Sequence, residues 1–175
     1  IGTVLALRIQ MTAMPQLVGL YNGFGGGASF LVAAVAMTAG ASAIDYQTPE
    51  LQQTIAAALS AVIGMVTLLG SVVAFAKLQG IMRRPIRFAG QQALNGILLA
   101  VMFVLAVFVV RQPETISWFW ILAVVAACFG FLLVAPIGGA DMPVVIAALN
   151  SYSGLAACAT GFVLRSLSTS RRWSI

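Results

Sequence analysis

Long apolar runs separated by short polar breaks fill most of the chain. A transmembrane helix needs about 20 predominantly apolar residues to cross roughly 30 Å of hydrocarbon. Five runs reach or approach that length, at about 15–40, 51–78, 90–110, 118–135 and 142–164. The runs are continuous rather than alternating, which favours helices over a β-barrel. The pattern therefore predicts an all-α, polytopic transmembrane helix bundle of about five full spans, preceded by a partial helix at residues 1–9.

The composition is that of a protein solvated by lipid. Hydrophobic residues make up 61% of the chain, charged residues only 7%, and the mean hydropathy is +1.04. Soluble domains carry about 25% charged residues. The net charge of +5 comes from bases beside the apolar runs, which is typical of topology signals rather than of nucleic-acid binding. We expect an integral membrane protein without a nucleic-acid partner.

The sequence predicts neither a metal site nor a nucleotide site. There is no histidine, and Cys128 and Cys158 fall inside apolar runs without CxxC spacing. Residues 23–28, GFGGGA, match the glycine fingerprint of dinucleotide-binding folds, and Asp45 follows at a suitable distance. That fingerprint needs a strand before it, whereas these glycines lie inside a spanning run. We expect no cofactor to bind this chain itself.

Basic residues predict the orientation in the membrane. The 77–87 loop carries four bases, and bases concentrate in short cytoplasmic loops. Alternation then places the 136–141 loop in the cytoplasm, and the 41–50 and 111–117 loops outside. The basic segment 165–175 would lie outside, against the charge rule. Either the last run does not fully cross, or this segment is not a natural end.

A stripe of polar and small residues follows the run 51–78. At about 100° per residue, five of them fall within about 40° of one line. They are Gln53, Ser60, Gly64, Thr67 and Ser71. One interpretation is close helix packing, in which small residues let helices approach and hydroxyls bond across the contact. The other interpretation is a hydrated seam that carries protons or ions.

The run 142–164 places polar groups deep in the membrane. One helical face collects Asn150, Ser153, Gly154, Ala157 and Gly161. An amide at the depth of Asn150 must find hydrogen-bond partners, because hydrocarbon supplies none. Within the run 15–40, a narrower stripe combines Asn22, Gly26, Ser29, Ala33 and Gly40. We expect these three small, polar faces to meet around an axis, with the bulkier runs 90–110 and 118–135 peripheral or facing lipid.

Asp141 precedes the last run and has two interpretations. It is placed to cap a helix that starts at Met142, where a negative charge suits the helix N-terminus. In the second interpretation, its carboxylate lies at the cytoplasmic opening of a polar path through the membrane. Asn150 lies about 13 Å deeper along the same helix, at about 1.5 Å per residue.

Three motifs resemble one membrane protein family. Residues 136–162, PIGGADMPVVIAALNSYSGLAACATGF, resemble the membrane domain of the beta subunit of proton-translocating NAD(P) transhydrogenase. Residues 11–29, MTAMPQLVGLYNGFGGGAS, and 70–80, GSVVAFAKLQG, look like the same family in the same order. The family continues into another span and an NADP(H)-binding domain, whereas 165–175 departs from it. We therefore expect a truncated or altered end.

The resemblance implies a proton-translocating enzyme complex that transfers hydride between NADH and NADP⁺. It implies that residues 1–164 form the transmembrane proton-translocating domain and that 165–175 are an atypical basic tail. Separate soluble domains would bind NADP(H) and NAD(H), and this chain alone would not catalyse hydride transfer. An alpha-type membrane subunit would be a partner, in a homodimeric complex of the bacterial inner (cytoplasmic) membrane.

The resemblance also implies roles for individual residues. Asp141 and Asn150 match family positions linked to the proton path and to coupling with the NADP(H)-binding domain. We assign to the same path the polar members of the two stripes: Ser153, Gln53, Ser60, Thr67 and Ser71. We assign helix packing to Asn22, Gly26, Ser29, Gly64, Gly154 and Gly161. The family often carries a histidine in this domain, and the chain has none, so the titrating group is not identified.

Two other functions stay open on the sequence. The stripes would also suit an unrelated small transporter or channel whose substrate path they line. Alternatively, the chain is a fragment that assembles with partners but conducts nothing.

The orientation is testable with single cysteines introduced after Cys128 and Cys158 are replaced. We expect Arg84→Cys to react with a membrane-impermeant maleimide from the cytoplasmic side, because bases are retained there. We expect Asp45→Cys to react from the outside. The reverse pattern of labelling would contradict the topology.

Overall fold

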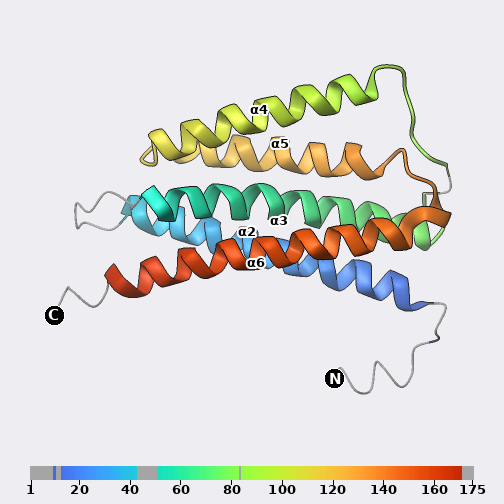
Figure 1. Ribbon diagram of the computed structural model, residues 1–175, viewed down its shortest axis with the longest axis horizontal. Coiled ribbons are helices and arrows are strands. Elements are labelled where there is room, and N and C mark those ends of the chain that lie inside the picture. Colours follow the sequence, from blue (N-terminus) through green and yellow to red (C-terminus); the bar gives the residue numbers. More distant parts are fainter. Residues whose placement is uncertain (1–9, 11–12, 43–50, 83, 171–175) are drawn as a thin grey trace.

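The computed structural model of the protein describes residues 10, 13–42, 51–82 and 84–170. Five long helices traverse the bundle in alternating directions (Figure 1). They are α2 (Met14–Ser42), α3 (Leu51–Leu78), α4 (Gln91–Arg111), α5 (Ile116–Val134) and α6 (Met142–Ser170), with a 3₁₀ turn, η2 (Gly139–Asp141), before α6. Each is long and apolar enough to cross a membrane. The predicted all-α bundle of five spans is confirmed, while the partial helix expected at 1–9 lies outside the described residues.

Helix α3 lies at the centre of the bundle. It packs against all four other long helices. Figure 1 shows α5 and α4 on one side of it, and α2 and α6 on the other. The buried apolar residues in the N-terminal half of α3 are small: Ala56, Ala57, Ala58 and Ala61. Small side chains let several neighbours approach one helix closely, which lipid-solvated bundles need because the hydrophobic effect does not drive their helices together.

Helices α2 and α3 touch backbone to backbone at one pair of glycines. A Cβ built on Gly64 would lie 2.6 Å from the carbonyl oxygen of Gly26 and 3.1 Å from the backbone nitrogen of Phe30. A Cβ built on Gly26 would lie 2.7 Å from the carbonyl oxygen of Gly64. Any larger residue at either position would push the two helices apart. The geometry explains why both stripes contain glycine at this level.

Helix α5 differs from the expectation that it lies at the periphery. Phe119, Leu122 and Ala126 are fully buried in the main apolar cluster. A Cβ built on Gly130 would lie 2.6 Å from the carbonyl oxygen of Val66, so α5 packs directly on α3 through a second glycine contact. The prediction for α5 was wrong because the average bulk of a run does not reveal one glycine that admits a neighbouring backbone.

Helix α4 is peripheral, as expected. Only four of its residues are buried: Gln91, Met102, Leu105 and Val109. They are the positions that face α5 and α3, and large apolar residues such as Phe103 and Ile97 are exposed on the opposite side. This exposed face suits lipid chains, which solvate apolar side chains without cost.

The connections between successive helices lie at the two ends of the bundle. The α3–α4 and α5–α6 connections lie at one end, and the α4–α5 connection lies at the other (Figure 1). This arrangement agrees with the alternation that we used to place loops 77–87 and 136–141 on the same side. A second apolar cluster closes the first of these ends, formed by Val73, Ala74, Val134, Met142, Ile146 and Leu149. The position predicted for Asp45 falls outside the described residues.

The glycine contact between α2 and α3 is testable by adding bulk. Gly64→Leu should destabilise the fold by about 1–3 kcal/mol or more, because the added carbons meet backbone that cannot move aside. Gly96→Leu on α4 is a matched control, since no atom of the described residues lies within 4 Å of a Cβ built there. Unfolding in detergent, followed by circular dichroism, measures both variants. Equal losses at the two positions would contradict the close contact.

Candidate functional site

A line of buried polar side chains runs along the contact between α2, α3 and α6. We call it the polar seam. Its members are Asn22 and Ser29 on α2, Gln53, Ser60, Thr67 and Ser71 on α3, and Thr160 on α6. Each is less than one-tenth exposed. Their predicted convergence on a buried face is observed for the α2 and α3 stripes, because the Gly26–Gly64 contact brings these two faces together.

At the inner end of the polar seam, the end toward the α3–α4 connection, α2 and α3 are joined by a side-chain hydrogen bond. The amide nitrogen of Asn22 donates to the hydroxyl oxygen of Ser71 over 3.2 Å. The other amide atom, Asn22 Oδ1, is buried and has no partner among the described residues. Asn22 was predicted to serve helix packing, and its side chain also leaves an unused acceptor inside the bundle.

One turn further along α3, Thr67 presents a second unpaired polar atom. Thr67 is completely buried, and its Oγ1 has no partner among the described residues. The side chain lies against α2, since a Cβ built on Gly26 would be 2.9 Å from Thr67 Cβ. Buried polar atoms without a protein partner are the usual sites of ordered internal water. Asn22 and Thr67 therefore mark the stretch of the polar seam that is suited to hold water.

Toward the other end, Ser60 and Thr160 form a hydroxyl pair between α3 and α6. Their oxygens are 2.8 Å apart. Ser60 Oγ also donates to the carbonyl oxygen of Ser29 over 3.0 Å, and Thr160 Oγ1 to that of Ala156 over 2.8 Å. Two hydroxyl hydrogens thus serve three contacts, so the pair has alternative donor–acceptor patterns. At this level every hydroxyl of the polar seam has a hydrogen-bond partner, and the hydroxyl hydrogens can change partners.

Helix α6 meets the bundle through a different line of residues from the one predicted. The buried positions recur at spacings of three and four: Met142, Ile146, Leu149, Ala156, Thr160 and Val163. Ser153, also on this line, is partly buried, with its Oγ 3.1 Å from a Cβ built on Gly25. The correction has a physical cause in close packing, because Ile146 and Leu149 lie against glycines of α2 and α3. A Cβ built on Gly19 would be 3.3 Å from Ile146 Cδ1, and one built on Gly70 would be 3.2 Å from Leu149 Cδ2.

The predicted α6 stripe lies beside that buried line. Asn150, Ala157, Gly154 and Gly161 are exposed in this chain. No atom of the described residues comes within 4 Å of a Cβ built on Gly154 or Gly161. The described residues therefore do not use these two glycines for packing. Of the predicted α6 residues, only Ser153 turns toward α2, and Thr160 is a polar contact that the analysis of the stripe missed.

Asp141 is exposed at the inner end of the bundle, in η2 directly before α6. Its backbone N–H donates to the carbonyl oxygen of Gly138 over 3.2 Å, which closes the turn. The next residue, Met142, is fully buried against α3 and α5. The carboxylate is thus open to solvent or to a partner at this face, and it does not join the buried polar seam.

Lys77 is a buried cation that sequence reasoning treated only as a topology signal. It lies in the last turn of α3 and is 6% exposed. Its Nζ donates to the backbone carbonyl oxygens of Val134, Ala135 and Ile137. The signal was present in the sequence, because a lysine inside an apolar run must either reach the interface or find partners.

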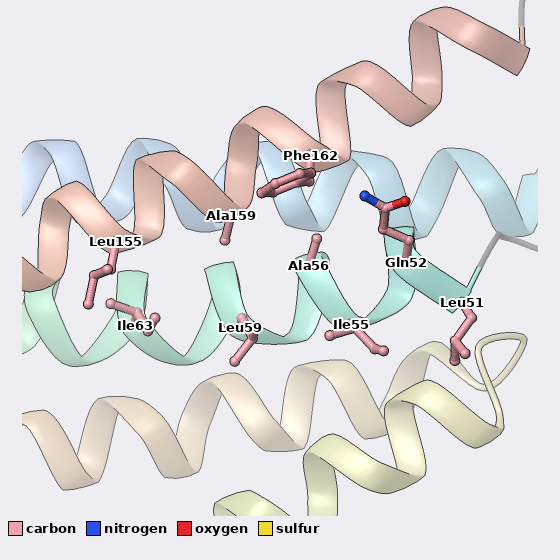
Figure 2. A pocket seen from close by; sticks show the side chains of 9 residues that line it. All are labelled: Leu51, Gln52, Ile55, Ala56, Leu59, Ile63, Leu155, Ala159 and Phe162. Carbon is pink, nitrogen blue, oxygen red and sulfur yellow. The ribbon is translucent and has the colours of Figure 1, made fainter.

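A groove of about 570 Å³ lies between α3 and α6, apart from the polar seam (Figure 2). Its lining is Leu51, Gln52, Ile55, Ala56, Leu59, Ile63, Leu155, Ala159 and Phe162. Only Gln52 among these carries a polar side chain, so the groove offers no group for proton transfer or metal binding. In the part of the chain that the structure describes, no cluster of three or more metal-ligating side chains occurs, and both cysteines are free.

Comparison with known proteins agrees with the fold and the motifs. Residues 1–168 match the family described as NAD(P) transhydrogenase beta subunit. NAD(P) transhydrogenase subunit beta of Rhodospirillum rubrum is 41% identical over 172 residues. The match covers 94% of this chain and 36% of the relative's length. The same protein from a designated strain of that species gives the same identity and coverage.

The hydroxyl pair of the polar seam is testable with a double-mutant cycle. Ser60→Ala and Thr160→Val each remove one hydroxyl while nearly conserving volume. We expect a coupling energy of about 0.6 kcal/mol between them, which is the average for hydrogen bonds across membrane helices. Reversible unfolding in detergent of the two single variants and the double variant gives this value. Strict additivity of the two losses would show that the pair contributes no interaction energy.

Proposed function

The chain belongs to the NAD(P) transhydrogenase beta subunit family, and we propose that it conducts protons across the membrane in a proton-translocating transhydrogenase. Hydride transfer between NADH and NADP⁺ would take place in separate soluble domains. The chain spans 36% of the length of the curated relatives that it matches, so these activities are proposed for the complex to which it contributes. Family membership disfavours the unrelated transporter that the sequence alone left open.

The observation that carries the proposal is the pair of unpaired atoms in the polar seam. Asn22 Oδ1 and Thr67 Oγ1 are buried without a partner in the described chain. In hydrocarbon, an unpaired polar group costs several kcal/mol, which favours water at these two atoms on the facing sides of α2 and α3. The third such atom in the described chain, Asn95 Oδ1, lies on α4 and outside the polar seam. Water bound at Asn22 and Thr67 would extend the Asn22–Ser71 bond along the inner half of the polar seam, and further water would have to pass the Gly26–Gly64 contact to reach the Ser60–Thr160 pair. A chain of this kind passes protons by reorientation of its hydrogen bonds.

The polar seam relays protons but does not titrate. Hydroxyl and amide groups neither gain nor lose a proton near neutral pH, so a titrating group must act with them. We place Asp141 at the inner end of this path, where its exposed carboxylate would face solvent or the NADP(H)-binding domain. The titrating group would come from a partner subunit. Asn150, Gly154 and Gly161 would face that subunit across the exposed side of α6.

The assembly follows from the same proposal. An alpha-type transhydrogenase membrane subunit would pack beside this chain, and soluble domains would bind NADP(H) and NAD(H) outside the bilayer. The complex would be homodimeric and would reside in the bacterial cytoplasmic membrane, with loops 77–87 and 136–141 facing the cytoplasm. Residues 1–164 would form the proton-translocating domain, and 165–175 an atypical basic tail.

The proposal is testable at Thr67. Thr67→Val conserves shape and removes a hydroxyl that has no protein partner, so stability should be unchanged or higher. Proton pumping by the reconstituted complex should nevertheless fall by about tenfold, because the water held at this position loses its anchor. A nucleotide-exchange reaction that needs no transmembrane proton should continue.

Thr54→Val is the matched control for this test. Thr54 is equally buried on α3, and its Oγ1 already bonds within its own helix, to the carbonyl oxygen of Leu51. Its replacement should leave pumping at the level of the parent. If Thr67→Val also pumps like the parent, the polar seam serves packing only, and the chain is an assembly element that does not conduct.

A further inference from the structure

The inner end of α5 is held by donors from a single neighbouring segment. Lys77 Nζ donates to the carbonyl oxygens of Val134, Ala135 and Ile137, at distances of 3.1, 2.5 and 2.5 Å. A lysine ammonium has three N–H donors, so all three are used. Its partners are neutral backbone carbonyls, which form the negative end of the α5 dipole.

Further donors follow Lys77 along the chain. The backbone N–H of Ile86 donates to the carbonyl oxygen of Ala135 over 3.0 Å. Arg87 Nε donates to that of Pro136 over 2.9 Å, and Gln91 Nε2 to that of Leu132 over 3.1 Å. The carbonyls of residues 132 and 134–137 therefore all accept hydrogen bonds from the end of α3, the connection to α4 and the first residue of α4. We call this set of bonds the α5 anchor.

The α5 anchor ends four residues before Asp141. Gly138 and Gly139 follow Ile137, and no atom of the described residues lies within 4 Å of a Cβ built on Gly139. On the far side of Asp141, Met142 is buried between α3 and α5. The carboxylate is thus carried by a short turn that is fixed at both ends, and Lys77 supplies three of the six hydrogen bonds at the first end.

Lys77 and the polar seam share one rigid element. Lys77 follows Ser71 by six residues on α3, about 9 Å along the helix axis. Any shift of α3 that accompanies rearrangement at Ser71 would therefore reach the turn that carries Asp141. The side chain does not need to change protonation for this role, because it acts by fixing backbone.

We propose that Lys77 is a positioning residue that sets the place of Asp141 relative to the polar seam and so links proton movement to the partner domain. The proposal rests on the function proposed above for Asp141. The effect of Lys77 passes through the carbonyls of the α5 anchor, to which its Nζ donates.

The experiment compares Lys77→Met with Lys77→Arg in the intact complex reconstituted into vesicles. Methionine keeps an unbranched stem of similar length and leaves the carbonyls without their donors, whereas arginine keeps charge and donors. In Lys77→Met, we expect amide hydrogen exchange over residues 137–141 to accelerate by about tenfold or more. Proton pumping should fall several-fold relative to nucleotide exchange, and Lys77→Arg should restore most of both.

Two further variants keep the experiment decisive. Arg84→Met removes a positive charge from the same connection at an exposed site and should change neither measurement. Arg87→Met removes a single bond of the α5 anchor and should accelerate amide exchange to a smaller extent, which supplies the test if Lys77→Met does not assemble.

The outcomes separate this proposal from the proposed function. Unchanged amide exchange in Lys77→Met would overturn the α5 anchor. Faster exchange with an unchanged ratio of pumping to nucleotide exchange would overturn the positioning role and leave a purely structural lysine. Asp141→Asn is measured in parallel, and pumping at the level of the parent in that variant would overturn the function assigned to Asp141 itself, whatever the exchange at Lys77→Met shows.

Discussion

The backbone contact between Gly26 and Gly64 is the constraint on which the rest of the site depends. Hydrocarbon supplies no hydrogen-bond partners, so polar side chains in a membrane helix must be satisfied by neighbouring helices or by water. Short side chains such as serine reach a neighbouring helix only where the two backbones nearly touch. The glycine pair creates that proximity, and Asn22 with Ser71 on one side of it and Ser29 with Ser60 on the other bond across the contact.

The two halves of the polar seam are satisfied to different degrees. At Ser60 and Thr160, every oxygen has a protein partner, so this half holds three helices together while its hydroxyl hydrogens can still change partners. At Asn22 and Thr67, unpaired atoms remain. A polar network that is partly satisfied by protein and completed by water is less rigid than a fully bonded one. The inner half is therefore the part suited to rearrangement, and it lies at the same end of the bundle as Lys77 and Asp141.

Helix α6 has two distinct long faces. Its buried face combines large apolar residues with Thr160 and closes the bundle over α2 and α3. The adjacent face, with Asn150, Gly154 and Gly161, is exposed, and a Cβ built on either glycine would meet no atom of the described residues within 4 Å. An exposed amide in the middle of a spanning helix is costly in lipid. This face is thus suited to a partner helix in the proposed complex, where small residues would again permit close approach.

The sequence by itself determined the class of the protein and most of its secondary structure. Long apolar runs can only be spanning helices in a bilayer, so the extents of α2 to α5 and the start of α6 followed from composition and length. Helix α6 runs to Ser170, six residues past the predicted end of its run. The buried stripe on α3 also followed, because small and polar residues repeated at helical spacing over the whole run. The motif around Asp141 indicated the family, which the comparisons confirmed.

Only the tertiary structure decided which face of each helix is buried. Helices α5 and α6 carry several possible packing faces, and the choice depends on the summed fit against neighbours, which no local pattern records. Helix α5 packs on α3 because Gly130 lies directly against Val66. Helix α6 buries the face that carries Met142, Ile146 and Leu149 and not the face that its polar residues suggested. The partners of Lys77 lie 57 to 60 residues away in the chain. Hydrogen bonds over such separations form only when the helices assemble. No local sequence pattern pairs a donor with an acceptor so far along the chain, so the sequence could not predict them.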